Sequence, residues 1–203
     1  MLQRPHDASL WRTYTRSRYA TLFYVLLLTL LAMPLIVTLQ LPAWVIKIPV
    51  AACLLAAVMP YATRRTRVIL LLAVLMVAGA ATAAEQGHLP VNSGLLTAAL
   101  GLIGIATAAG TVRFMVTSKR VDSETVYAAL STYLLAGIFF GQLYWAVERL
   151  VPGSIVGPDP LTEQSASYFS FVTLATLGYG DFLPRNDLAR GIATFEVIGA
   201  QLY

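Results

Sequence analysis

An all-α integral membrane protein with six transmembrane helices and one short re-entrant segment is the fold class that the sequence predicts. Apolar residues make up 58% of the chain and charged residues 12%, about half the charged fraction of a water-soluble domain. The apolar residues form long, continuous blocks, and about 20 such residues suffice for a helix to cross a bilayer. Because these blocks do not alternate with polar residues, they indicate helices rather than the strands of a barrel.

Six blocks are predicted to cross the membrane. They are Tyr19–Gln40, Trp44–Met59, Val68–Ala84, Gly94–Val116, Thr125–Val147 and Leu188–Tyr203. The second is interrupted near its start by Lys47 and Pro49. A seventh apolar segment, residues 165–177, lies between the last two spans and is too short to cross. We therefore expect it to enter the membrane and return to the same side.

Basic residues in the short connections predict the orientation, because Lys and Arg gather on the cytoplasmic side. Ten of the fourteen fall on alternate connections of one side: Arg4, Arg12, Arg16, Arg18, Arg64, Arg65, Arg67, Arg113, Lys119 and Arg120. Acidic residues dominate the other side: Glu85, Glu148, Asp159, Glu163, Asp181 and Asp187. We therefore expect a cytoplasmic N-terminus and a re-entrant segment that enters from outside. This distribution accounts for the net charge of +4 without a nucleic-acid partner.

The most informative motif is TLATLGYGD, at Thr173–Asp181. It resembles the pore signature T-x-x-T-x-G-Y-G-D of the tetrameric potassium channels at every fixed position. The resemblance to a pore module extends from about Thr125 to the C-terminus, and prokaryotic members with one pore loop per chain are the most similar. The first four spans match only in number and orientation.

The residue types in this motif suit the binding of a dehydrated cation. A ring of backbone carbonyls can replace the water shell of K⁺, and Gly178 and Gly180 permit the unusual backbone angles that would aim those carbonyls along one axis. Thr176 adds a hydroxyl oxygen at the inner end. Leu177 and Tyr179 are expected to point their side chains away from the ion path. The resemblance implies that K⁺ would be held through Thr176, Leu177, Gly178 and Tyr179, with Gly180 completing the selectivity filter.

The segment before the motif is predicted to form a short pore helix. Thr162 is a suitable N-cap and Glu163 suits the first turn, and the helix would extend to about Ala175. Its partly negative C-terminal end would then point toward the ion path. In the family's pattern, Tyr168 falls where an aromatic residue braces the filter, and we expect it to hydrogen-bond Asp181 at the outer mouth.

Two departures from the family bear on selectivity and filter support. Leu177 replaces the commoner Val or Ile, and Val172 replaces a Glu that in some members pairs with the acid after the filter. Glu196 is the one acid within a predicted span, and we expect it to stabilise the pore helix by accepting a hydrogen bond from Thr173, with ion attraction as the alternative. Gly199 lies near the family's inner-helix hinge, and helix packing explains it equally well.

The fourth span lacks a basic residue at every third position, so steep voltage gating is not expected. Spans four and five instead carry small residues typical of closely packed helices. These are Gly94, Gly101, Gly104, Ala108, Gly110, Gly137 and Gly141.

Together these observations predict a cytoplasmic segment (1–18), a four-helix transmembrane region (19–120) and a pore module (121–203). The resemblance implies a homotetrameric, potassium-selective channel of the cell membrane, with K⁺ as the permeant ion, no cofactor and no identified gating ligand. No enzyme motif is present. The alternatives are a less selective cation channel, a truncated or non-conducting subunit, and a secondary transporter, which internal repeats would favour. Counted from Leu188, the last helix has sixteen residues and measures about 24 Å, which is shorter than the hydrocarbon core of about 30 Å. We therefore expect either that the helix continues beyond the given sequence or that its inner gate is abbreviated.

Overall fold

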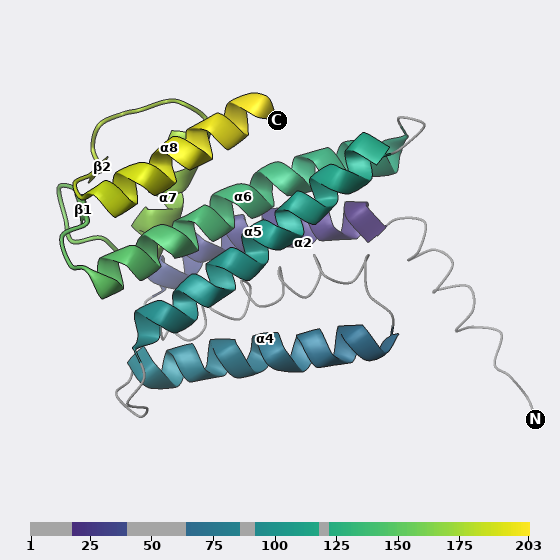
Figure 1. Ribbon diagram of the computed structural model, residues 1–203, viewed down its shortest axis with the longest axis horizontal. Helices are drawn as coiled ribbons and strands as arrows, with labels where there is room; N and C mark the ends of the chain where they lie inside the picture. Colours follow the sequence, from purple (N-terminus) through teal and green to yellow (C-terminus); the bar gives the residue numbers. More distant parts are fainter. Residues whose placement is uncertain (1–17, 40–63, 86–91, 118–121) are drawn as a thin grey trace, which may run out of the picture.

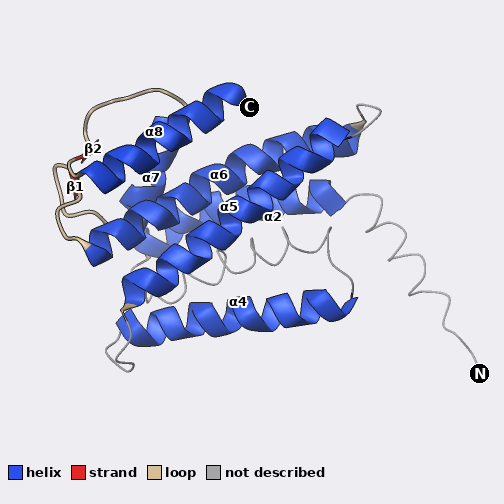
Figure 2. Cartoon of the chain, viewed as in Figure 1, coloured by secondary structure: helices blue, strands red, loops and turns tan. Residues whose placement is uncertain are grey.

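The computed structural model describes residues 18–39, 64–85, 92–117 and 122–203 and is mostly helical there (Figures 1 and 2). The helices are α2 (Arg18–Thr38), α4 (Arg64–Glu85), α5 (Ser93–Thr117), α6 (Ser123–Leu150), α7 (Glu163–Leu174) and α8 (Asp187–Leu202). Two short strands, β1 (Ile155–Val156) and β2 (Leu183–Pro184), pair antiparallel beside the start of α8. The predicted second span, Trp44–Met59, and nearly all of the predicted cytoplasmic segment lie outside the described residues.

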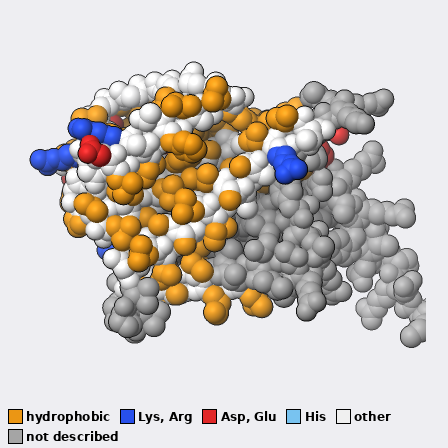
Figure 3. Space-filling model, viewed as in Figure 1, with side chains coloured by type: hydrophobic (Ala, Val, Ile, Leu, Met, Phe, Trp, Pro, Cys, Tyr) orange, Lys and Arg blue, Asp and Glu red, His pale blue; other side chains and the backbone are white. Residues whose placement is uncertain are grey.

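Three of the described helices contain a segment that is long and apolar enough to cross a membrane. These segments are Tyr19–Ile36, Ser93–Thr117 and Ser123–Leu150. The described part of α4 adds a shorter apolar segment, Leu75–Ala84, and α8 has 16 residues. On the face seen in Figure 3, hydrophobic side chains cover the middle and charged ones lie toward the two ends, as expected for a membrane protein. The arrangement of six spans stays a prediction.

Helices α5 and α6 lie side by side along most of their length (Figure 1) because three glycines of α5 receive large side chains of α6. The pairs are Gly94 with Leu150, Gly101 with Leu143 and Gly104 with Phe139. A methyl carbon at any of these glycines would lie within 2.8 Å of the facing side chain, closer than non-bonded carbons approach. The packing role predicted for these small residues is confirmed.

Glycines of α6 also receive α7, the segment predicted from the sequence to form a pore helix. A methyl carbon at Gly137 would lie 2.3 Å from the Phe171 ring, and one at Gly141 would lie 2.6 Å from the Cα of Ser167. The second contact is with backbone, so α7 rests directly on the surface of α6. The position of α7, and of the loop that follows it, is therefore set by α6.

Helix α2 is attached to the opposite end of α6. The backbone amide of Tyr19 donates to the Glu124 carboxylate (3.0 Å), which lies in the first turn of α6. Asp122 caps α6 by accepting from the Thr125 amide (2.9 Å) and the Thr125 hydroxyl (2.9 Å). The hydrogen bond from the Thr125 amide lowers the pKa of this exposed carboxyl. Residues of α2 and α6 thus share one buried cluster, which includes Leu22.

Candidate functional site

The site begins at the N-terminus of α7, which is held by a capping box. The Thr162 hydroxyl accepts from the Ser165 amide (3.1 Å), and the Ser165 hydroxyl accepts from the Thr162 amide (2.7 Å). The N-cap predicted at Thr162 is confirmed. Gln142 of α6, which is buried, donates to the Glu163 carboxylate (2.8 Å). This bond attaches the first turn of α7 to α6.

The C-terminus of α7 is closed by a Schellman motif. The helix ends at Leu174, the Leu177 amide donates to the Val172 carbonyl, and the Thr176 amide donates to the Thr173 carbonyl, each at 2.9 Å. This motif requires a left-handed residue after the cap, which is usually Gly or Asn. Here the residue is Thr176, with φ of +56°. The chain therefore leaves α7 through a conformation that disfavours a β-branched side chain.

The sign of φ alternates along the segment that follows. Thr176 (+56°), Gly178 (+56°) and Gly180 (+78°) have positive φ, and Leu177 and Tyr179 do not. In an ordinary strand successive residues face opposite sides, whereas reversing φ at every second residue turns over alternate peptide units. The unusual angles expected at both glycines are present. Thr176 is the one non-glycine residue with positive φ in the described part of the chain, and strain of this kind concentrates at functional sites.

Side chains of this segment point outward from the single chain. Leu177 is 54% exposed and Tyr179 is 66% exposed, although both are large and apolar or aromatic. The described residues hold no cluster of three or more His, Cys, Asp or Glu side chains suited to a metal ion.

The outer end of the segment is braced by aromatic and polar contacts. An interaction with the Asp181 carboxylate raises the pKa of the Tyr168 hydroxyl, and the hydrogen bond expected between them from the sequence stays a prediction. The Tyr168 ring also meets the edge of Phe182, with ring centroids 6.3 Å apart. These contacts fix residues 181 and 182 against α7.

A second brace comes from the loop after α6. The Glu148 carboxylate accepts from the amides of Gly153 (2.7 Å) and Ile155 (3.1 Å). Ile155 then pairs with Pro184 in the two-stranded sheet. The segment that leaves the motif toward α8 is thereby attached to the end of α6.

Glu196 of α8 is fully buried, and each of its carboxylate oxygens accepts a hydrogen bond. The Tyr144 hydroxyl of α6 donates to one oxygen and the Ser170 hydroxyl of α7 donates to the other, both at 2.6 Å. Glu196 accepts a hydrogen bond from the helix that it was expected to support. The donor is Ser170, so the donor predicted from the sequence, Thr173, is wrong. Ser170 lies one helical turn before Thr173, and α7 carries hydroxyls at both positions and at Ser165 and Ser167, so the sequence alone did not single it out.

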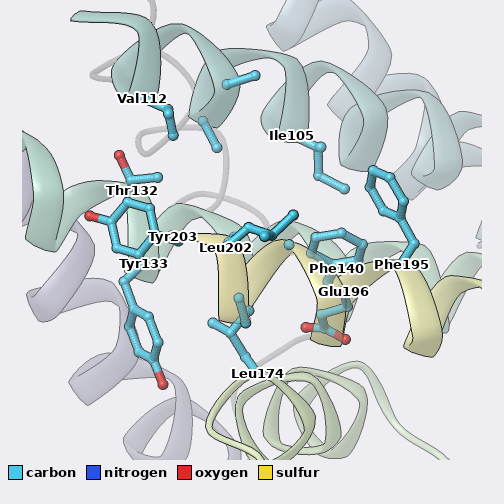
Figure 4. A pocket seen from close by; sticks show the side chains of 15 residues that line it. Ile105, Val112, Thr132, Tyr133, Phe140, Leu174, Phe195, Glu196, Leu202 and Tyr203 are labelled. Carbon is cyan, nitrogen blue, oxygen red and sulfur yellow. The ribbon is translucent and has the colours of Figure 1, made fainter. Parts of the chain in front are cut away.

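From Glu196 toward its C-terminus, α8 is separated from α5 and α6 by an apolar cavity of about 280 Å³. Figure 4 shows Phe140 and Phe195 on one side of it and Tyr203 on another, with the Glu196 carboxylate turned away from its centre. Gly199 lines the cavity and lies inside the continuous helix α8. Its role as a hinge stays a prediction.

Residues 129–200 match the model of a family described as "Ion channel". The match begins in α6, includes α7 and the motif, and ends in α8. No curated protein and no solved structure matches the chain. The match, together with the apolar helices, supports an ion channel domain in a membrane protein and a transport function rather than an enzymatic one.

Proposed function

We propose that this chain is one subunit of a homotetrameric, potassium-selective channel and that residues 176–180 form its selectivity filter. The observation that carries this proposal is the alternating sign of φ at Thr176, Gly178 and Gly180, in a segment that directly follows a short helix. The matched family describes an ion channel, and selectivity for K⁺ is inferred from the motif.

The chemistry of K⁺ favours this backbone. A K⁺ ion that sheds its water needs several oxygens at once, and carbonyls in successive peptide units supply them without a counter-charge. The Thr176 hydroxyl would add an oxygen at the inner end. A left-handed Thr costs about 1–2 kcal/mol relative to an ordinary conformation, and Gly would avoid that cost. The presence of Thr at this position is accounted for if its hydroxyl contacts the ion.

A single strand supplies only one side of such a filter, so we infer that four chains surround the ion path. The exposed Leu177 and Tyr179 side chains would then be covered by neighbouring copies. On α8, Phe195 and Ile198 are also exposed, at 66% and 53%, which suits contact with other chains or with lipid. The proposed orientation places the filter mouth outside the cell membrane and the N-terminus in the cytoplasm.

The test compares K⁺ and Na⁺ flux into liposomes that contain the purified protein. The native protein should pass K⁺ and largely exclude Na⁺. The variant Gly180→Ala should lose this selectivity, because alanine at φ of +78° is strained by about 1–2 kcal/mol in each of four filter strands.

Gly153→Ala is a matched control. Gly153 has φ of +79°, and nothing lies within 4 Å of a methyl carbon at either glycine, so the backbone strain is the same. Because Gly153 lies outside the motif, its variant should keep the native selectivity. Equal flux of K⁺ and Na⁺ through the native protein would indicate a less selective cation channel. Absence of flux through native tetramers would indicate a non-conducting subunit.

A further inference from the structure

Glu196 joins three helices at one buried point. Its carboxylate on α8 accepts hydroxyl hydrogen bonds from Tyr144 on α6 and Ser170 on α7, both at 2.6 Å. The Tyr144 ring also packs edge-on against Phe169 of α7, with ring centroids 4.8 Å apart. Hydrogen bonds to a carboxylate are roughly twice as strong as those between neutral groups. A buried carboxyl group held by two such bonds resists displacement, because losing either one leaves a buried oxygen without a partner.

This point is one of only two buried positions on α8. The other is Ala189, two turns earlier, near the start of the helix. After Glu196, α8 borders the apolar cavity through residues such as Gly199. The part of α8 up to Glu196 is therefore fixed to α6 and α7. The part after Glu196 has free space beside it.

Ser170 connects this point to the filter through a short and rigid path. It lies four residues before the end of α7, and the Schellman motif then bonds Thr176 and Leu177 directly to the last turn of the helix. A displacement of α8 that pulls on Glu196 is thereby applied to the helix that carries the filter.

We propose that Glu196 is a positioning residue that couples α8 to the filter and stabilises the conducting conformation of the filter. It does so through Ser170 and Tyr144 and does not contact the ion. This coupling rests on the proposed channel function for its electrical consequence. Its structural part, the stabilisation of α7 and residues 176–180, does not depend on which ion passes.

The first experiment records single channels in planar bilayers. Ser170→Ala and Tyr144→Phe each remove one donor, and Glu196→Gln removes the charge. Each should shorten the open dwell time by about tenfold or more, the effect of losing one hydrogen bond to a charged group, with unitary current and K⁺/Na⁺ selectivity unchanged. Ser170→Ala should have a smaller effect in the Glu196→Gln background than in the native protein, because Glu196→Gln already weakens the acceptor of the Ser170 hydrogen bond.

Ser167→Ala is the matched control for Ser170→Ala. Ser167 is also buried on α7, but its hydroxyl donates to the Glu163 carbonyl of its own helix (3.2 Å). It should leave the dwell time as in the native protein. A purely structural role for Glu196 would lower the yield of folded protein but leave the dwell time of the surviving channels unchanged. Dwell times in Ser170→Ala equal to those in Ser167→Ala would overturn the proposal.

Hydrogen exchange of the backbone amides in residues 172–180 provides a second readout that needs no current. Exchange should be faster in Ser170→Ala than in Ser167→Ala, and equal rates would also overturn the proposal. If the native protein passes no ions, the proposed channel function fails, and hydrogen exchange alone decides whether Glu196 stabilises the filter segment.

Discussion

Replacing Gly141 by Ala tests how α6 sets the position of α7. The new methyl carbon would lie 2.6 Å from the Cα of Ser167 and 3.1 Å from its amide nitrogen. Both are backbone atoms of α7, so no side-chain rotation relieves the contact. Since non-bonded carbons rest about 3.5–4.0 Å apart, α7 must move away from α6 by about 1 Å.

The magnitude follows from two opposing effects. Overpacking of this kind costs about 1–3 kcal/mol, and alanine in place of glycine gains about 1 kcal/mol in helix propensity. Gly79→Ala in α4 is the control, because nothing lies within 4 Å of a methyl carbon there and only the propensity gain remains. The free energies of unfolding of the two variants should differ by about 1–3 kcal/mol.

The assay is thermal unfolding in detergent, followed by tryptophan fluorescence, together with K⁺ flux in liposomes. For a chain of this size the expected difference is about 2–12 °C in Tm, with Gly141→Ala the lower. Flux should fall in Gly141→Ala, because the displaced α7 carries residues 176–180, and should be native in Gly79→Ala. A Gly141→Ala protein that melts with Gly79→Ala and conducts normally would refute the close contact between α6 and α7.

Three further changes test the supports of the site. Tyr168→Phe removes the hydroxyl that interacts with Asp181, so K⁺ flux should decay faster after the start of an assay than in the native protein; an unchanged time course would count against this brace. Glu148→Ala removes the acceptor for two loop amides and should speed hydrogen exchange in residues 153–156, whereas native exchange rates would contradict its role. A hydrogen bond from the Thr125 amide lowers the pKa of Asp122 below its usual 3.8, so this stabilisation is complete above pH 3.8 and is lost as the pH falls through the lowered value. Asp122→Asn, which keeps an N-cap acceptor, should remove that part of the acid dependence of Tm, and an identical acid dependence in both proteins would exclude it.

Local chemistry made the ends of the short helix predictable from the sequence. The N-cap at Thr162 depends on residues within one turn, and the structure confirms it, with Ser165 completing the capping box. The break after Leu174 and the positive φ at Gly178 and Gly180 follow from a motif whose glycines permit that conformation. The close packing expected of glycines in α5 and α6 also holds at Gly94, Gly101, Gly104, Gly137 and Gly141, because small residues at helical spacing leave room for a neighbouring helix.

Tertiary contacts were harder to predict. The partner of Glu196 depends on how α8 is rotated and shifted against α7, and one turn of difference separates Ser170 from the expected Thr173. Tyr144 was missed because it comes from a third helix, 52 residues away in the chain. Nothing in the sequence near Glu196 indicates which of several hydroxyls would reach it.

The three glycine contacts between α5 and α6 have a mechanical consequence. Large side chains of α6 occupy the space left beside Gly94, Gly101 and Gly104. Sliding one helix along the other would push each of these side chains against the larger neighbours of the glycines. The pair can tilt or rotate as one body, but it cannot shift in register without separating. A displacement of α5 along its axis would therefore move α6 with it.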